Sequence, residues 1–256
     1  MNSFFKCANY LGLNRRLFSK ITYNVNKFGL LDLQSVTDVS VSTIDCQTHP
    51  DQNVAFVHYK CLDRNEMNKF QSSWKFDVLK IRNGNELPEH ATSMCQIEIP
   101  VKFNVLLDLI RKANVSVQNL QNECVNVKLL DGSCTIKDLL TDKLNISASA
   151  GDVVAKGSVQ TNAVINIKGT GTINAEKIIG ETFQASTNYG DVCINSLYVT
   201  QSNITTTFGS IKIGHAHKTL NVTITEQGSL DIGIHLFFVA SVRLMVTSRQ
   251  IYVTET

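Results

Sequence analysis

A glycine recurs at a nearly fixed interval between residues 113 and 233, and this repeat is the feature that most restricts the possible folds. Each glycine is followed by a small polar residue and then by an apolar one, and successive glycine numbers differ by 19, 20, 19, 19 and 19. Residues 113–117 read as an earlier, degenerate copy. A repeat of this length is typical of stacked structural units. The predicted corner positions are Gly132, Gly151, Gly171, Gly190, Gly209 and Gly228.

Each repeat contains two short apolar segments, one just after the glycine, as in 192–194, and one before the next glycine, as in 220–222. Strands this short, with glycine at the corners, leave no room for a helix. One rung buries side chains worth roughly 10 kcal/mol, whereas ordering its backbone costs on the order of 19–38 kcal/mol. A rung is therefore stable only in a stack. The pattern predicts an all-β fold, a single-stranded β-helix-like β-solenoid with coils of about 19 residues whose strands stack at roughly 4.8 Å per rung.

The residues after the corner glycines form a column of short, oxygen-bearing side chains that can hydrogen-bond the turn backbone. Asp152 and Asp191 in this column are two rungs apart, so their carboxylates are separated by roughly 9–10 Å. That distance overlaps the upper end of an inverting glycosidase pair. However, Thr172 lies between them and the corner role explains both. We predict no catalytic residue, and a carbohydrate-active β-helix enzyme is the third of three hypotheses. The column is Ser133, Asp152, Thr172, Asp191, Ser210 and Ser229.

The regions on either side of the repeat show other patterns. Residues 29–112 alternate between apolar and polar positions, as in 39–42, 74–76 and 95–99, which is typical of strands. We expect a β-rich N-terminal cap region there, covering the first open rung, because unpaired strand edges need protection. After Gly233 the repeat fails, so residues 234–256 are expected to be a divergent or truncated C-terminal cap.

The first 28 residues contain five basic side chains and no acid. Arginine-bearing, acid-free and amphipathic segments are typical of mitochondrial transit peptides, and a cut between Phe18 and Ser19 would fit matrix processing. The alternative is an ordinary basic terminus. The segment predicts a mitochondrial protein, in the matrix; the other possible location is secreted or on the cell surface.

Composition excludes several classes of protein. The net charge is only +2, with no long basic block, which argues against nucleic acid as the main partner. No run of apolar residues reaches the roughly 18–20 that span a membrane. The seven cysteines form no C-x-x-C pair and are interpreted as small buried thiols rather than a disulfide framework.

Two further motifs have simple structural explanations. His215 and His217 could supply two metal ligands, but a third is not evident, and we predict no metal and no cofactor. Four glycosylation sequons are explained by outward-pointing asparagines on alternating strands and would matter only in a secreted protein. The sequons begin at Asn114, Asn145, Asn203 and Asn221.

Residues 95–103 lead into the repeats, and the steps Tyr189-Gly190-Asp191-Val192 and Phe208-Gly209-Ser210-Ile211 recur within them. With these motifs the chain resembles the adhesin-type β-solenoid family, whose function is not known, and within it most closely an animal member. The resemblance covers roughly residues 30–233. It implies a β-solenoid and, for animal members, a mitochondrial address, and it implies no catalytic residues.

Two main hypotheses about function follow. The first is a non-enzymatic mitochondrial scaffold that offers flat solenoid faces to an unknown protein partner. The second is an extracellular adhesin-like binding module with glycans on its sequons. The oligomeric state is left open.

Overall fold

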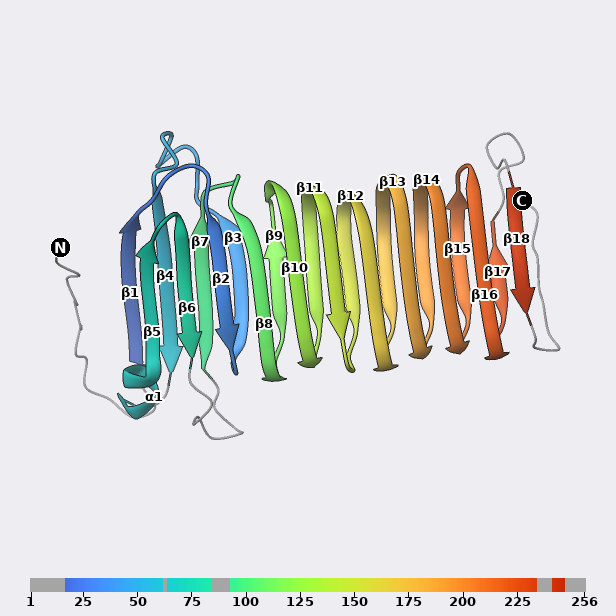
Figure 1. The fold of residues 1–256 in the computed structure, drawn as a ribbon, viewed down its shortest axis with the longest axis horizontal. Helices are drawn as coiled ribbons and strands as arrows, with labels where there is room; N and C mark the ends of the chain where they lie inside the picture. Colours follow the sequence, from blue (N-terminus) through green and yellow to red (C-terminus); the bar gives the residue numbers. More distant parts are fainter. Residues whose placement is uncertain (1–16, 62–63, 84–92, 234–240, 247–256) are drawn as a thin grey trace.

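The computed structural model describes residues 17–61, 64–83, 93–233 and 241–246. Its strands lie side by side in one long stack, with the N-terminal strands at one end and the C-terminal strands at the other (Figure 1). The buried apolar side chains form one continuous core cluster from Val25 to Ile232. The predicted β-solenoid is therefore confirmed for the described residues.

The repeat forms parallel rungs, in which each strand pairs with the strand one coil later. Ile165, for example, lies opposite Ala185 across a parallel pair, so the register offset equals the sequence period. The rung strands are β10 (Gln121–Asp131), β11 (Cys134–Ala148), β12 (Val153–Thr170), β13 (Ile173–Tyr189), β14 (Val192–Phe208), β15 (Ile211–Ala216), β16 (Thr219–Gln227), β17 (Leu230–Ile232) and β18 (Ser241–Val246).

The coil has two long faces on opposite sides of the core. The front face, which faces the viewer in Figure 1, is made by β10, the C-terminal halves of β11–β14, and β16 and β18. The back face is made by the N-terminal halves of β11–β14 with β15 and β17. On both faces buried and outward side chains alternate along each strand, as they must when one side of a sheet covers a core.

The predicted cap region over 29–112 belongs to the same stack, but the order of its rungs in space differs from their order in the sequence. The β2–β3 rung lies between the β6–β7 rung and the β8–β9 rung, because β2 pairs in parallel with both β6 and β8, and β3 with both β7 and β9. The sheet and core therefore continue without a break past residue 112. The strands are β2 (Leu30–Ser35), β3 (Asp38–Thr43), β6 (Val78–Asn83), β7 (Met94–Ile99), β8 (Asn104–Lys112) and β9 (Val115–Gln118).

Antiparallel strands and a short helix close the N-terminal end. β1 (Leu17–Asn24) pairs with β4 (Val54–Cys61), β4 pairs with β7, and β5 (Phe70–Lys75) pairs with β6. Helix α1 (Arg64–Lys69) precedes β5. Aromatic rings fill this end: Tyr59 stacks on Phe70 with centroids 4.4 Å apart, and Trp74 lies 5.9 Å from Phe103. The antiparallel strands end the regular run of parallel rungs, which limits head-to-head pairing of solenoids.

The predicted transit segment 1–28 lies partly outside the described residues. Its described part includes β1, in which Ser19 lies opposite Tyr59. A cut between Phe18 and Ser19 would leave six of the eight strand residues in place, whereas removal of all 28 residues would delete β1. The cleavage site stays a prediction.

At the C-terminal end, β18 continues the parallel stack beyond residue 233, opposite β16. The pattern of corner glycines stops before this strand, so pairing with the preceding rung persists where the sequence motif is lost. Residues 234–240 and 247–256 lie outside the described part of the chain.

None of the six described cysteines forms a disulfide bond, and Cys46 among them is exposed rather than buried as expected. Burial raises the pKa of the Cys95 and Cys134 thiols to about 12, so both remain protonated and poorly nucleophilic at neutral pH. Cys7 lies outside the described residues. For Cys95 and Cys134 the interpretation as small buried apolar side chains fits the structure.

Candidate binding face

The side chains of the corner column hydrogen-bond the turn of the following rung. Oδ1 of Asp152 accepts from the backbone N–H and the hydroxyl of Thr172, at 2.7 and 2.8 Å. Oδ1 of Asp191 accepts from the backbone N–H of Ser210 at 2.6 Å. The prediction had each side chain bonding its own turn; the structure shows bonds between rungs. Further links join Asp38 to Asn114, Asn114 to Ser133, and Ser210 to Ser229.

These bonds give Asp152 and Asp191 a structural role. Each carboxylate satisfies the corner backbone of the next rung, and Thr172 stands between them as a hydrogen-bond donor to Asp152. Nothing in this geometry aims both carboxylates at a shared substrate position, so the column supports the corner interpretation rather than the glycosidase one.

The corner glycines pack backbone against backbone. A Cβ on Gly151 would overlap the carbonyl oxygen of Gly132, and a Cβ on Gly171 would overlap that of Gly151. The same overlap recurs at Gly190, Gly209 and Gly228. Gly151 also has a φ of +107°, which L side chains rarely adopt. The corner positions themselves therefore require glycine, because successive turns approach too closely for any side chain.

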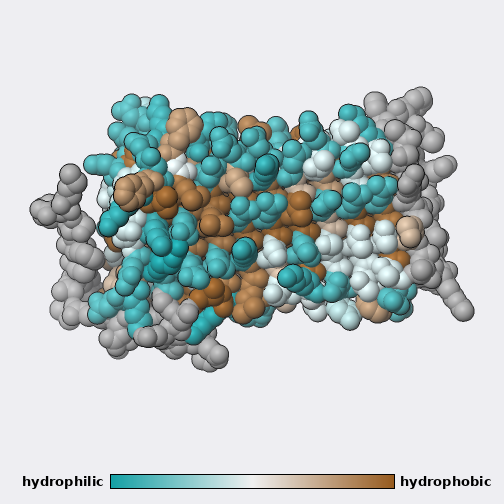
Figure 2. Space-filling view, viewed as in Figure 1, coloured by the Kyte–Doolittle hydropathy of each residue, from teal (hydrophilic) through white to brown (hydrophobic). Residues whose placement is uncertain are grey.

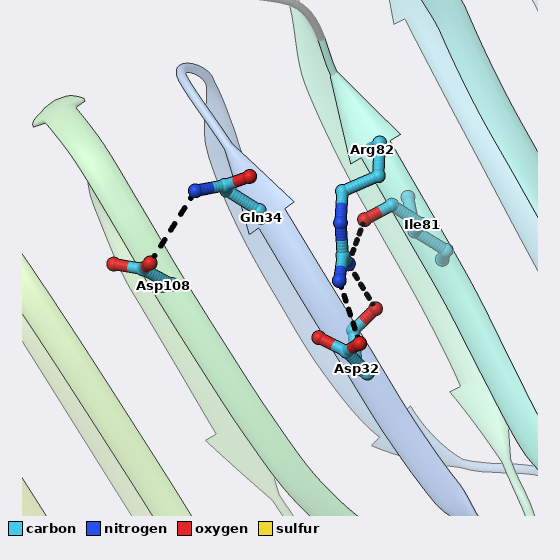
Figure 3. Close-up of polar contacts among 5 residues, drawn as sticks. All are labelled: Asp32, Gln34, Ile81, Arg82 and Asp108. Atoms are coloured by element: carbon cyan, nitrogen blue, oxygen red, sulfur yellow. Dashed lines mark hydrogen bonds and ion pairs between the residues drawn. The ribbon is translucent and has the colours of Figure 1, made fainter.

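The front face changes character along the stack. At its N-terminal end it is charged: Nη2 of Arg82 contacts Oδ2 of Asp32 at 2.6 Å, and Nη1 donates to the Asp32 carbonyl oxygen at 2.8 Å (Figure 3). Gln34 on the same strand as Asp32 donates to Asp108 at 3.5 Å. The Arg82 guanidinium thus links β6 to β2, and the Gln34 amide links β2 to β8. The charged groups of Arg82, Asp32 and Asp108 therefore bond neighbouring strands of the sheet.

Over β12, β13, β14 and β16 three neighbouring outward columns of the front face carry no charged side chain, and the next outward residue of β12, Lys168, is exposed and charged. The columns follow from the strand register and from hydrogen bonds between rungs, such as the bond from the Asn221 amide to Oδ1 of Asn203 at 2.7 Å. All but one of the twelve side chains are amides or hydroxyls; Val164 is the exception. The columns are Asn162, Thr182, Gln201, Thr219; Val164, Gln184, Asn203, Asn221; and Asn166, Ser186, Thr205, Thr223.

Figure 2 colours the same face by hydropathy. The C-terminal half of this face shows rows of hydrophilic and intermediate residues, while brown patches gather toward the middle and the N-terminal half. A flat, rigid and uncharged polar surface of this kind can form many hydrogen bonds with a partner without the desolvation cost of buried charges.

The histidine pair does not form a metal site with other described residues. His215 is exposed, and the ring of His217 lies 4.4 Å from the ring of Tyr198. Among the described residues no group of three histidine, cysteine or acidic side chains is placed to hold a metal ion.

Three of the four sequon asparagines lie on the front face. Asn145 and Asn221 each donate their side-chain amide to the asparagine one rung earlier, at 2.9 and 2.7 Å. Asn203 is exposed and serves as an acceptor. Asn114 lies in the corner column instead. A glycan at any of the three front-face positions would cover the uncharged columns.

A family model described as Toastrack DUF4097 matches residues 97–227. These are 131 residues (227 − 97 + 1), just over half of the 256 in the chain. The chain belongs to the Toastrack family. The match begins in β7 and ends with β16, so it covers most of the parallel rungs and the uncharged part of the front face.

Solved structures share the Toastrack fold at low sequence identity. A "putative adhesin" of Bacteroides fragilis matches with a TM-score of 0.56 at 15% identity, covering 93% of this chain and 97% of that one. A putative adhesin of Parabacteroides distasonis matches with a TM-score of 0.54 at 14% identity over 93% and 97%. A putative lipid binding protein of the same species gives 0.51 at 11% identity over 93% and 96%. These likenesses establish the fold alone.

Sequence reasoning missed two features of the Toastrack chain. The first is the uncharged front face, which was visible in the sequence only as frequent Asn, Ser and Thr. The second is the turn between β5 and β6: residues 74–76 were expected in a strand, but β5 ends at Lys75 and Phe76 lies in the turn. Asp77 favours a turn, but Phe76 does not, so the alternation was the stronger cue. No helix among the described residues of the Toastrack chain is long and apolar enough to cross a membrane.

Proposed function

We propose that this Toastrack chain is a non-enzymatic, adhesin-like binding module whose front face contacts its partner at the cell surface or in the secreted state. One observation carries the proposal: twelve outward side chains over four rungs contain no charge and all but one are polar. The descriptions of two similar structures as adhesins support the same class and location.

The geometry supports binding through a face rather than in a cleft. The rungs are joined by parallel ladders along the whole stack, so the columns repeat at the rung spacing of roughly 4.8 Å. A preorganised surface loses little conformational entropy when a partner binds. Extended ligands match such a surface better than compact ones, because polar side chains recur at the same positions on successive rungs.

A mitochondrial scaffold is the second candidate, and residues 1–28 are the observation that favours it. Five basic side chains and no acid in that segment fit import, and the resemblance of the sequence motifs to animal members of the adhesin-type β-solenoid family implies the same address. On this candidate the front face would bind a protein inside the organelle.

The mature N-terminus and compartment of the endogenous protein separate the two candidates. The adhesin-like proposal predicts that protease added to intact cells digests the cell-surface protein. It also predicts that the mature protein does not begin at Ser19. The sequence hypothesis places glycans on the sequons, whereas binding through the front face predicts that Asn145, Asn203 and Asn221 are unmodified, because glycans there would cover that face. A start at Ser19 in a mitochondrial fraction would contradict the proposed location and favour the scaffold.

A further inference from the structure

Phe76 is the most exposed large apolar side chain of the described residues, at 96%. It occupies the turn between β5 and β6, where its φ is +51° and that of Asp77 is +58°. Two successive residues with positive φ define the hairpin turn that normally takes Asn-Gly. A bulky residue in this conformation is an outlier, and such local strain often marks a functional position.

The turn is fixed by contacts through Asp77. The Asp77 carboxylate accepts a hydrogen bond from the side-chain amide of Asn26, and its carbonyl oxygen accepts one from the backbone N–H of Leu30 at 2.9 Å. The turn is thereby joined to the loop before β2, while the ring of Phe76 stays in solvent.

A second exposed ring lies at the same end of the sheet. Leu30 and Val78 are opposite each other in the parallel β2–β6 pair, and Phe28 and Phe76 each precede them by two residues. Phe28 is 68% exposed. We call Phe28 and Phe76 the aromatic tip.

Lysines surround the aromatic tip. Lys27 and Lys75 are exposed and adjacent to the two rings in sequence. Lys102 is also exposed and precedes Asn104, which lies opposite Leu30 in the β2–β8 pair. The adjacent acid, Asp77, is bonded to Asn26. Two further exposed acids, Asp45 and Asp51, lie in the β3–β4 loop next to the tip. In that loop the Asn53 carbonyl oxygen accepts from the backbone N–H of Val25 at 2.8 Å, and Oε1 of Gln52 accepts from that of Val101 at 3.0 Å.

We propose that the aromatic tip inserts into an anionic membrane surface, with Lys27, Lys75 and Lys102 contacting lipid headgroups. Phenylalanine rings can bury in the boundary between lipid headgroups and acyl chains, and each nearby lysine adds attraction to anionic lipids. The rings project from strand ends with basic side chains around them, which suits a flat charged surface. This inference concerns the N-terminal end and is independent of the front face.

Phe76→Asn provides the sharpest test, because Asn tolerates positive φ and suits this turn. The full chain is mixed with phosphatidylcholine vesicles, with or without phosphatidylserine, and the floated fraction is measured. Wild type should float with the phosphatidylserine vesicles and be released by salt. Phe76→Asn should lower the apparent partition coefficient about tenfold while raising Tm by about 2 °C or more.

Phe28→Asn provides a second variant, with the same expected loss of flotation. Tyr189→Asn is the matched control, since Tyr189 is also an exposed ring but lies far along the stack, and it should float as wild type does. Failure of wild type to float, or flotation of Phe76→Asn equal to that of wild type, would overturn the proposal. A gain in stability without a loss of flotation would show that Phe76 is strained for another reason.

Discussion

Gly151→Ala should destabilise the chain by about 3–5 kcal/mol and lower Tm by roughly 10 °C. The new Cβ would overlap the carbonyl oxygen of Gly132, and the φ of +107° is unfavourable for alanine. Neither problem can be relieved locally, because Gly132 and Gly171 are held in register by the neighbouring rungs. Urea unfolding followed by circular dichroism measures the effect.

Gln160→Ala is the matched control for this change. Gln160 is an exposed residue of β12, the strand that follows Gly151, and its loss should change stability by no more than about 0.5 kcal/mol. If Gly151→Ala reduced stability no more than the control does, the close backbone packing of the corner glycines described above would be contradicted.

Phe183→Ala should cost about 3–5 kcal/mol. Phe183 is fully buried, and its partners in register on the adjacent rungs are Ala163 and Ser202, both small and buried. Large and small side chains therefore alternate along this inward column. Since Ala163 and Ser202 cannot fill the space left by the ring, the cavity should remain open, which places the cost toward the upper end of the range.

The neighbouring change Gln184→Ala tests whether this loss reflects core packing. Gln184 points outward from the same strand and should leave the urea midpoint almost unchanged. Equal midpoints for the two variants would contradict the placement of Phe183 in the core. If only Phe183→Ala lowers the urea midpoint, and the slope of ΔG against urea concentration is unchanged, the variant has lost stability through the missing core side chain.

The glycine period was enough to predict the parallel rungs. A side chain at these corners would overlap the backbone of the neighbouring rung, so each corner needs a glycine and the length of one coil can be read from the glycines alone. The order of the N-terminal rungs could not be predicted in this way. Strand alternation in 39–42 and 95–99 indicates which side chains face the core, but it does not show that β2 is inserted between β6 and β8.

The candidate binding surfaces were predicted less well than the fold. The lack of charge on the front face depends on which residues of successive coils align, and bulges shift that register, as between Gln160 and Ala163. The aromatic tip was hidden because a phenylalanine, Phe76, occupies a turn position with positive φ where a small polar residue or glycine is usual. The roles of Asp152 and Asp191 were predicted more closely, although their hydrogen bonds cross between rungs.

Site-specific photo-cross-linking in living cells tests the central claim, binding through the front face, most directly. A photoreactive residue at Gln184, in the middle of the uncharged columns, is compared with one at Asn174 on the back face of the same strand. The account predicts one discrete cross-linked partner from position 184 and none from position 174. The same partner from position 174 alone, or equal labelling from both positions, would contradict it.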